Sequence, residues 1–251
     1  MQKNILIVGN WKMNPASVAE AKKLFVLIRK AVKKSDVTTV AIAPPLPFIS
    51  DLSKLSPSGR ISLSAQNVAV GDTGAETGNV SAPMLASVGV TYCIVGHSEC
   101  RARGEEDNLI VEKVQLLHKF GITPIVCVGE KKRDDSGNFY QEIELQIKAI
   151  ASGTKKNHLA KTIIAYEPVW AIGSGATPTT EEIQEVRLFI EKILTQSVDR
   201  ATARKVQVLY GGSVNNTNAG EILRETTMQG FLVGGASLKP DVFAKIIKSA
   251  G

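Results

Sequence analysis

The sequence predicts an α/β fold, a (β/α)8 barrel in which outer helices surround eight parallel strands. Eight short apolar runs recur along the 251 residues, amphipathic stretches lie between them, and no linker rich in Pro, Gly or Ser divides the chain. Eight such units in about 250 residues match the usual size of this barrel. We therefore expect a single domain over residues 1–251. A doubly wound parallel sheet is the alternative.

The apolar runs have the composition of buried parallel strands. In chain order they are NILIVGNW (4–11), TVAIAPP (39–45), ISLSAQN (61–67), YCIVGH (92–97), PIVCVGE (124–130), TIIAYEP (162–168), VQVLYGG (206–212) and GFLVGGAS (230–237). Most are apolar at successive positions, which is typical of strands buried on both faces. The turn after the first run lacks G-x-G-x-x-G, and this favours the barrel over a dinucleotide-binding doubly wound sheet.

The stretches between the runs are predicted to be helices, because two parallel strands need a crossover between them. Capping boxes formed by Ser17 with Glu20 and by Thr179 with Glu182 predict the starts of the helices after the first and sixth strands. One apolar face of the first helix consists of Ala21, Leu24, Phe25, Ile28 and Val32.

Composition limits the class of protein. With 43% hydrophobic and 22% charged residues, the chain can bury a large core, and no apolar run approaches the ~20 residues of a membrane span. The first 14 residues do not resemble a signal peptide. An odd, low count of three cysteines predicts a reducing, cytoplasmic location, and the Cys and His residues lack metal-ligand spacing, so we expect no metal and no cofactor.

The net charge of +6 would help to attract an anionic metabolite. The lysines are scattered over helical stretches and aromatic residues make up only 5% of the chain, so we expect neither a nucleic-acid nor a membrane surface.

The strand ends carry the functional signal, because the active site of such a barrel lies at the carboxyl ends of its strands. Each of these features has an ordinary structural explanation when taken singly: an interior histidine, a lysine directed to solvent, a carboxylate paired with a lysine, and tight glycine turns. Their coincidence at several strand ends predicts one site. In chain order these residues are Asn10, Lys12, Gln66, Asn67, His97, Ser98, Glu99, Glu167, Gly211, Gly212, Ser213, Gly234 and Gly235.

The residue types indicate a reaction. Glycine turns after strands seven and eight, with Gly173 in the loop after strand six, predict a phosphate site. That leaves Lys12, His97 and Glu167 for the other end of the ligand. A carboxylate base, an imidazole and an ammonium suit proton abstraction beside a carbonyl, followed by return of the proton to the neighbouring carbon. The loop after Glu167, PVWAIGSG (168–175), is predicted to close over the site and exclude water.

Several long motifs resemble the triosephosphate isomerase family over essentially the whole chain: GNWKMN (9–14), AQN (65–67), VGHSE (95–99), AYEPVWAIGSG (165–175), YGGSV (210–214) and GFLVGGASLKP (230–240). The resemblance implies a TIM barrel that interconverts D-glyceraldehyde 3-phosphate and dihydroxyacetone phosphate through an enediolate, in glycolysis and gluconeogenesis. It implies Glu167 as the base, His97 as the electrophile, Lys12 as a contact to substrate oxygen and phosphate, and Asn10 as an orienting residue. It assigns phosphate binding to Gly173, Ser213, Gly234 and Gly235.

The resemblance also implies a homodimer in which the loop 74–81, around Thr77, inserts into the second copy. Here the chain departs from the family, with Glu76 in place of an aromatic residue, Asn79 in place of an acid and Cys100 in place of an arginine. The acid and the arginine pair across the family's interface. Since both are absent, we expect a dimer held by apolar and hydrogen-bonded contacts, with weak salt dependence.

Two other classes of function remain open at this point. One is a different phosphate-binding barrel enzyme. The other is a non-enzymatic role on cell surfaces or on nucleic acid, driven by the basic charge.

Overall fold

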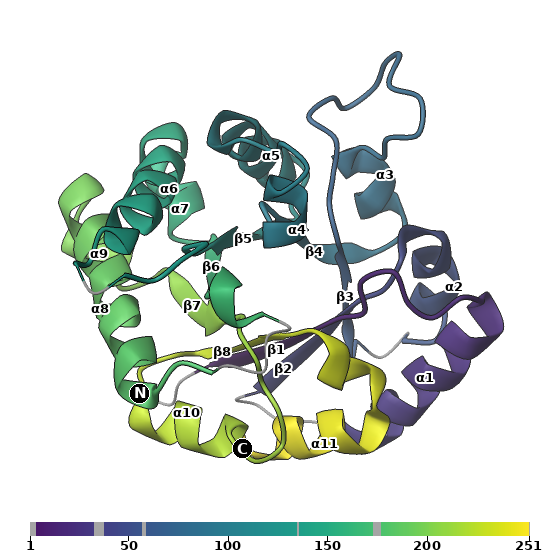
Figure 1. The fold of residues 1–251 in the computed structure, drawn as a ribbon. Helices are drawn as coiled ribbons and strands as arrows, with labels where there is room; N and C mark the ends of the chain where they lie inside the picture. The colour runs from purple at the N-terminus through teal and green to yellow at the C-terminus, as the bar shows by residue number, and fades with distance from the viewer. Residues whose placement is uncertain (1–3, 33–37, 57–58, 135, 173–176, 251) are drawn as a thin grey trace.

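A computed structural model of the chain describes residues 4–32, 38–56, 59–134, 136–172 and 177–250. Eight parallel strands form a closed barrel in which each strand pairs with its neighbours in sequence and β1 pairs with β8 (Figure 1). This confirms the predicted (β/α)8 architecture. The strands are β1 (Ile5–Asn10), β2 (Thr38–Ala43), β3 (Ser62–Ala65), β4 (Val90–Val95), β5 (Thr123–Val128), β6 (Ile163–Tyr166), β7 (Gln207–Tyr210) and β8 (Gly230–Val233).

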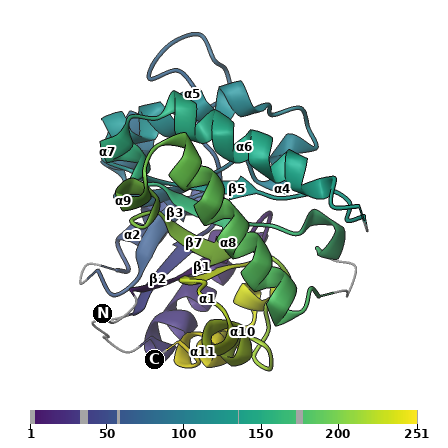
Figure 2. The same ribbon diagram turned by 90° about the vertical axis from the view of Figure 1, so that its left-hand side faces the viewer.

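At least one α-helix follows every strand. In chain order the helices are α1 (Val18–Ala31), α2 (Ile49–Ser53), α3 (Ala82–Ser87), α4 (Ser98–Arg101), α5 (Asp107–Lys119), α6 (Phe139–Gly153), α7 (Lys156–Leu159), α8 (Thr180–Ser197), α9 (Arg200–Ala203), α10 (Ala219–Glu225) and α11 (Pro240–Lys248), with short 3-10 helices η1 (Leu46–Phe48), η2 (Val169–Ala171) and η3 (Gly235–Leu238). Helices α5, α6 and α8 lie side by side outside the barrel (Figures 1 and 2). No described helix has the length and apolar character needed to cross a bilayer.

The predicted helix starts are present. Ser17 Oγ accepts the N–H of Glu20 at 3.3 Å, and Thr179 with Glu182 forms a full capping box. On α1 the predicted apolar face packs into the core. Phe25 is fully buried there, because a helical period of 3.6 residues brings this face against the strands.

Closure of the barrel depends on a glycine. At β8, Gly230 has a φ of +134°, and a Cβ at this position would lie 1.8 Å from the backbone oxygen of Leu6. A side chain here would push β8 away from β1, so a residue without one allows the two strands to pair.

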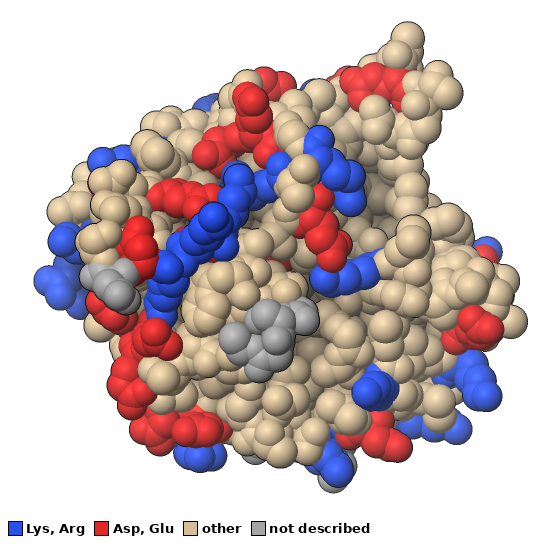
Figure 3. All heavy atoms as spheres, viewed as in Figure 1, with Lys and Arg blue, Asp and Glu red and all other residues tan. Residues whose placement is uncertain are grey.

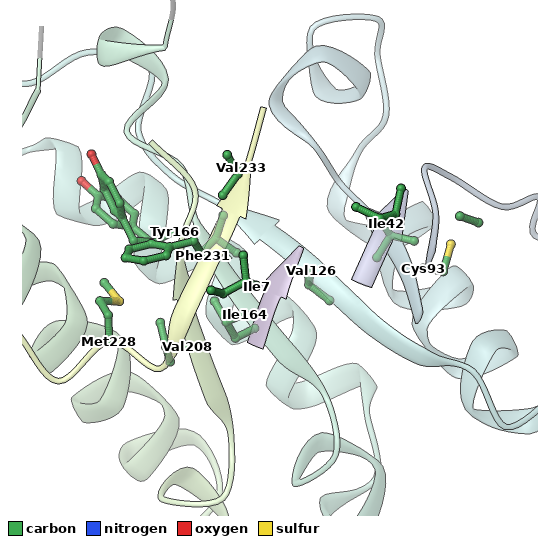
Figure 4. Close-up of a cluster of buried hydrophobic side chains, with 14 of the residues drawn as sticks. Ile7, Ile42, Cys93, Val126, Ile164, Tyr166, Val208, Met228, Phe231 and Val233 are labelled. Carbon is green, nitrogen blue, oxygen red and sulfur yellow. The ribbon is translucent and has the colours of Figure 1, made fainter. Parts of the chain in front are cut away.

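Alternate strand residues fall into two apolar clusters. Ile7 and Phe25 belong to the larger cluster, which joins strands to helices, and Figure 4 shows part of it. Leu6 and Val8 belong to a smaller cluster whose buried members all come from strands, so this cluster fills the barrel interior. Because both faces of each strand are covered, the sequence of each strand is a continuous run of apolar residues.

A pair of histidines stacks outside the barrel. The rings of His118, in α5, and His158, in α7, lie 4.6 Å apart with 17° between their planes. Thr162 Oγ1 donates to the backbone oxygen of His158 at 3.1 Å, so it accepts from His118 Nε2 at 2.9 Å. Burial first, then the charges of His158 and Lys161, lower the pKa of His118 from 6.5 to about 4.

We expect this histidine to make stability depend on pH. The pKa of His118 in the folded state lies below its value in the unfolded chain, so acid protonates the unfolded chain first. The contribution of His118 to the free energy of unfolding is therefore present above pH ~6.5 and is lost as pH falls toward ~4. Because the ring is only partly buried, solvent screening reduces the loss to about 1–2 kcal/mol. Urea unfolding at several pH values should show a shallower loss for His118→Gln than for the unmodified chain. Equal slopes for the two proteins would contradict this prediction.

Candidate active site

A cavity of about 330 Å³ opens at the carboxyl ends of the strands. Four of the residues that line it are Asn10 at the end of β1, His97 after β4, Glu167 directly after β6 and Gly211 directly after β7. The complete lining is Asn10, Lys12, His97, Glu167, Ile172, Gly211, Gly212, Ser213, Val214, Leu232, Gly234, Gly235 and Ala236. The lining includes most of the residues predicted for the site, but Gln66, Asn67, Ser98 and Glu99 are not part of it, and Gly173 lies outside the described residues.

Glu167 and His97 face one another in this cavity. Glu167 Oε1 lies 3.1 Å from His97 Nε2, and Glu167 Oε2 accepts the backbone N–H of Ser98 at 2.9 Å. The two residues are only 2% and 6% exposed. The carboxylate is thus held by hydrogen bonds to its neighbours at the cavity wall, and not by a helix-end lysine.

The surroundings of His97 determine which ring nitrogen carries the proton. His97 Nδ1 accepts the backbone N–H of Glu99 at 3.2 Å. In a neutral imidazole only one nitrogen is protonated, so the proton is on Nε2, the nitrogen that points at Glu167. His97 therefore presents a hydrogen-bond donor to the cavity.

Glycine at position 129 allows the close approach that aims Glu167. A Cβ at Gly129 would lie 1.7 Å from the backbone oxygen of Glu167. The end of β5 can therefore pack directly on the backbone of the residue after β6, and the ladder continues through the N–H of Glu167 to the oxygen of Val128 at 2.8 Å. Nothing in the apolar pattern of the β5 run indicated this role.

Lys12 reaches the cavity from a strained backbone. Its φ is +51°, the one positive value among the non-glycine residues that the structure describes, and such a conformation costs about 1 kcal/mol. Two hydrogen bonds hold it, from Lys12 N to Asn10 Oδ1 at 3.0 Å and from Gln66 Nε2 to the Lys12 oxygen at 2.8 Å. Asn10 and Gln66 therefore position the lysine backbone at the mouth of the cavity.

The ammonium of Lys12 pairs with Glu99 at 2.6 Å. Burial alone would raise the pKa of Glu99, but the hydrogen bond and charge of Lys12 outweigh it and lower that pKa. On the face that Figure 3 shows, other Lys and Arg side chains form a short band with Asp and Glu on both sides. Among the described residues that line the cavity, Lys12 is the cation.

The opposite wall consists of glycine turns. A Cβ at Gly211 would lie 3.0 Å from Glu167 Cγ, and one at Gly212 would lie 2.2 Å from the hydroxyl oxygen of Tyr210. A Cβ at Gly235 would meet open space, and one at Gly234 would lie 3.6 Å from Lys12 Cε. Successive backbone N–H groups in such turns suit an anion. Ile172 and Leu232 add apolar surface to the lining.

The segment after Glu167 is anchored at its first residues. Trp170 Nε1 donates to Glu130 Oε1 at 2.8 Å, and Tyr166 Oη donates to the same oxygen at 3.0 Å. Burial, the larger effect, raises the pKa of the Glu130 carboxyl. The described part of the predicted lid, residues 168–172, includes η2, while residues 173–175 of that lid lie outside the described chain.

The sequence predicts Ser98, Glu99 and Gln66 at strand ends but assigns them no individual roles. The structure shows that Ser98 binds the carboxylate of Glu167, Glu99 pairs with Lys12 and Gln66 holds the backbone of Lys12. Their partners come from different strands, so no local pattern could have shown these contacts.

Comparisons with known proteins show which family the chain resembles. A family model described as Triosephosphate isomerase matches residues 5–250. The chain is similar to the triosephosphate isomerase of Aquifex aeolicus, with 42% identity over 97% of this chain and 98% of the relative. It is similar to that of Serratia proteamaculans, with 40% identity over 98% and 96%. It is also similar to the triosephosphate isomerase of Nitrosococcus oceani, with 39% identity over 98% of this chain and 98% of the relative.

Proposed function

Because the chain belongs to the triosephosphate isomerase family and interconverts the triose phosphates of glycolysis, we propose that Glu167, His97 and Lys12 perform the proton transfer in the cavity of about 330 Å³. The observation that carries this proposal is the 3.1 Å contact between Glu167 Oε1 and the donor nitrogen of His97. A base and a hydrogen-bond donor then flank the space where a carbonyl and the adjacent C–H would lie.

The reaction follows from these groups. The phosphate of dihydroxyacetone phosphate would bind at the turns of Ser213, Gly234 and Gly235, and at Gly173. Its carbonyl oxygen would accept from His97 Nε2 and from Lys12, replacing the carboxylate at the imidazole. Glu167 then removes a proton from the carbon beside the carbonyl, which leaves an enediolate. The hydroxyl proton of the enediolate then passes to the former carbonyl oxygen, and return of the first proton to the former carbonyl carbon yields D-glyceraldehyde 3-phosphate.

The walls of the cavity favour this chemistry. Ile172 and Leu232 reduce the water around Glu167, which strengthens its interactions with charged and polar neighbours. Lys12 lies where negative charge develops on the substrate oxygen, and Asn10 would keep the ammonium in place through its bond to the Lys12 backbone. A coupled assay of glyceraldehyde 3-phosphate isomerisation tests the proposal directly, and absence of turnover in the purified chain would contradict it.

The imidazole should act mainly on the developing enediolate. We expect His97→Gln to lower kcat by roughly 10²- to 10³-fold and to change KM little, since the donor gains most strength when its acceptor becomes charged. The control is His118→Gln, which removes a histidine outside this cavity and should leave both constants near their original values. A change confined to KM would assign His97 to binding instead.

We further propose a cytoplasmic homodimer, with residues 1–251 forming one domain, and no nucleic-acid or membrane partner. A second cavity of about 500 Å³ supports the dimer, since it lies beside the 74–81 loop and is lined by Leu46, Gln66–Val70, Glu76, Gly78–Val80, Leu109 and Lys113. Of the residues that line this cavity, the apolar Leu46 is 42% exposed. Such surface is typical of an interface.

A further inference from the structure

Beyond the end of β5, the backbone next to Glu167 pairs with a strand on one side only. The oxygen of Val128 accepts the N–H of Glu167 at 2.8 Å, which continues the pairing with β6. On the other side, the pairing of β5 with β4 ends at Val126. Successive residues of a strand direct their backbone groups to alternate sides, so the N–H and C=O of Gly129 point to the edge where the pairing with β4 has ended. These two groups need partners from another part of the chain.

The side chain of Gln146, in α6, supplies both partners. The N–H of Gly129 donates to Gln146 Oε1 at 2.8 Å, and Gln146 Nε2 donates to the oxygen of Gly129 at 3.2 Å. Earlier on the same edge, Arg101 Nη2 donates to the oxygen of Cys127 at 3.2 Å. Two side chains therefore take the place of a neighbouring strand at this end of β5.

Gln146 lies on the buried face of α6, which packs outside the barrel between α5 and α8 (Figures 1 and 2). The residue is 5% exposed, and Ile143, Ile147 and Ile150 on the same face are fully buried. A polar side chain is costly in such surroundings unless its groups are hydrogen-bonded. Both of its described hydrogen bonds go to Gly129, and they account for an amide on an otherwise apolar face.

Gly129 in turn abuts the backbone of Glu167. A Cβ at Gly129 would lie 1.7 Å from the oxygen of Glu167 and 2.6 Å from its carbonyl carbon. Because backbones packed this closely leave no free space, a rotation of the Gly129 peptide would displace Glu167 as well. The carboxylate of Glu167 lies 3.1 Å from His97 Nε2, and a misplacement of ~1 Å in such an arrangement can cost about 100-fold in rate.

We propose that Gln146 is a positioning residue for the reaction: its amide fixes Gly129, and Gly129 fixes the backbone from which Glu167 reaches the substrate. This rests on the proposed function, in which Glu167 is the base. Gln146 is not among the residues that line the cavity of about 330 Å³, so it acts through Gly129 and not on the substrate. The alternative is a purely structural amide, which would contribute to stability and leave the kinetic constants unchanged.

Gln146→Met tests the proposal with a side chain of similar size that makes neither hydrogen bond. In the coupled assay we expect kcat to fall by roughly 10- to 100-fold, because the base is displaced. KM should stay within about threefold of the unmodified value, because the glycine turns that would bind the phosphate follow β7 and β8 and not β5.

Two further variants are controls. Gln115→Met makes the same substitution at an exposed position, where Gln115 Nε2 donates to the oxygen of Gly153 at 2.5 Å between α5 and α6. Ile150→Val removes one methyl group from the same buried face of α6 as Gln146 and so lowers stability without touching Gly129. Both controls should keep kcat within about twofold of the unmodified value.

Gln146→Glu provides a test within one protein. A protonated carboxyl has a donor and an acceptor, as the amide has, whereas an ionised carboxylate only accepts and would face the oxygen of Gly129. Burial raises the pKa of a carboxyl placed here above its ordinary value. We expect kcat to lie within about threefold of the unmodified value at acid pH and to fall toward the Gln146→Met value as pH rises. The unmodified chain at each pH is the reference, because its other titratable groups are the same.

The outcomes separate this inference from the proposed function. An unchanged kcat in Gln146→Met, a loss of equal size in Ile150→Val, or a Gln146→Glu ratio that does not vary with pH would overturn the positioning role and leave the proposed base intact. Full turnover in Glu167→Gln would overturn the base and the positioning role together. Circular dichroism checks the fold, and if Gln146→Met is unfolded, the pH dependence of Gln146→Glu decides the question.

Discussion

Replacing Glu167 by Gln should lower kcat by roughly 10³- to 10⁴-fold, the range expected for loss of a general base. The amide has nearly the same size, and its oxygen can still accept the N–H of Ser98, so the fold should survive. The described lining of the cavity holds no second carboxylate that could replace it. KM should change little, because the phosphate would still bind at the glycine turns.

A second measurement separates chemistry from binding. In deuterated water, dihydroxyacetone phosphate should exchange its C–H hydrogen in the presence of the unmodified enzyme and retain it with Glu167→Gln. Glu144→Gln, the same substitution in an exposed i,i+4 pair with Lys148, is the control and should keep full turnover. Near-normal turnover or continued exchange in Glu167→Gln, with an unchanged circular dichroism spectrum, would show that another group is the base.

Removing the ammonium at Lys12 should damage both kinetic constants. For Lys12→Ala we expect kcat to fall by roughly 100-fold and KM to rise by at least ~10-fold, since a charge-assisted hydrogen bond contributes about 1.5–3 kcal/mol. The ammonium attracts the phosphate in the ground state and stabilises the enediolate oxygen in the transition state. Its loss also leaves Glu99 as an unpaired carboxylate close to an anionic substrate.

The ion pair between Lys22 and Asp51 offers a matched control. Its length is 2.6 Å, the same as that of Lys12 with Glu99, and it is exposed on α1 and α2. Lys22→Ala should leave kcat and KM unchanged. Adding Glu99→Gln to Lys12→Ala should lower KM again, because the repelling carboxylate is neutralised. If Lys12→Ala altered kcat alone and the second substitution had no effect on KM, the ammonium would have no part in ground-state binding.

The sequence determined the architecture of the barrel because the signals for its elements are local. A strand that is buried on both faces must be apolar at successive positions, and the β1 and β6 runs meet this condition. Glycine turns and polar residues after the strands indicated the site for the same reason, since parallel strands deliver their carboxyl ends to one edge of the sheet. The sequence predicted the ends of the strands less well. The GFLVGGAS run extends beyond the end of β8 into η3, where helical turns replace the hydrogen bonds between strands.

Only the tertiary structure decided which of these polar groups touch. His97 Nε2 meets Glu167, Lys12 meets Glu99, and Gln66 reaches the backbone of Lys12 across positions that lie far apart in sequence. The propensity and periodicity of a sequence depend on residues that are close together along the chain. Ion pairs and hydrogen bonds instead depend on a distance of a few ångströms in space. Contacts between distant segments therefore follow from the closed barrel and not from any local stretch of the chain.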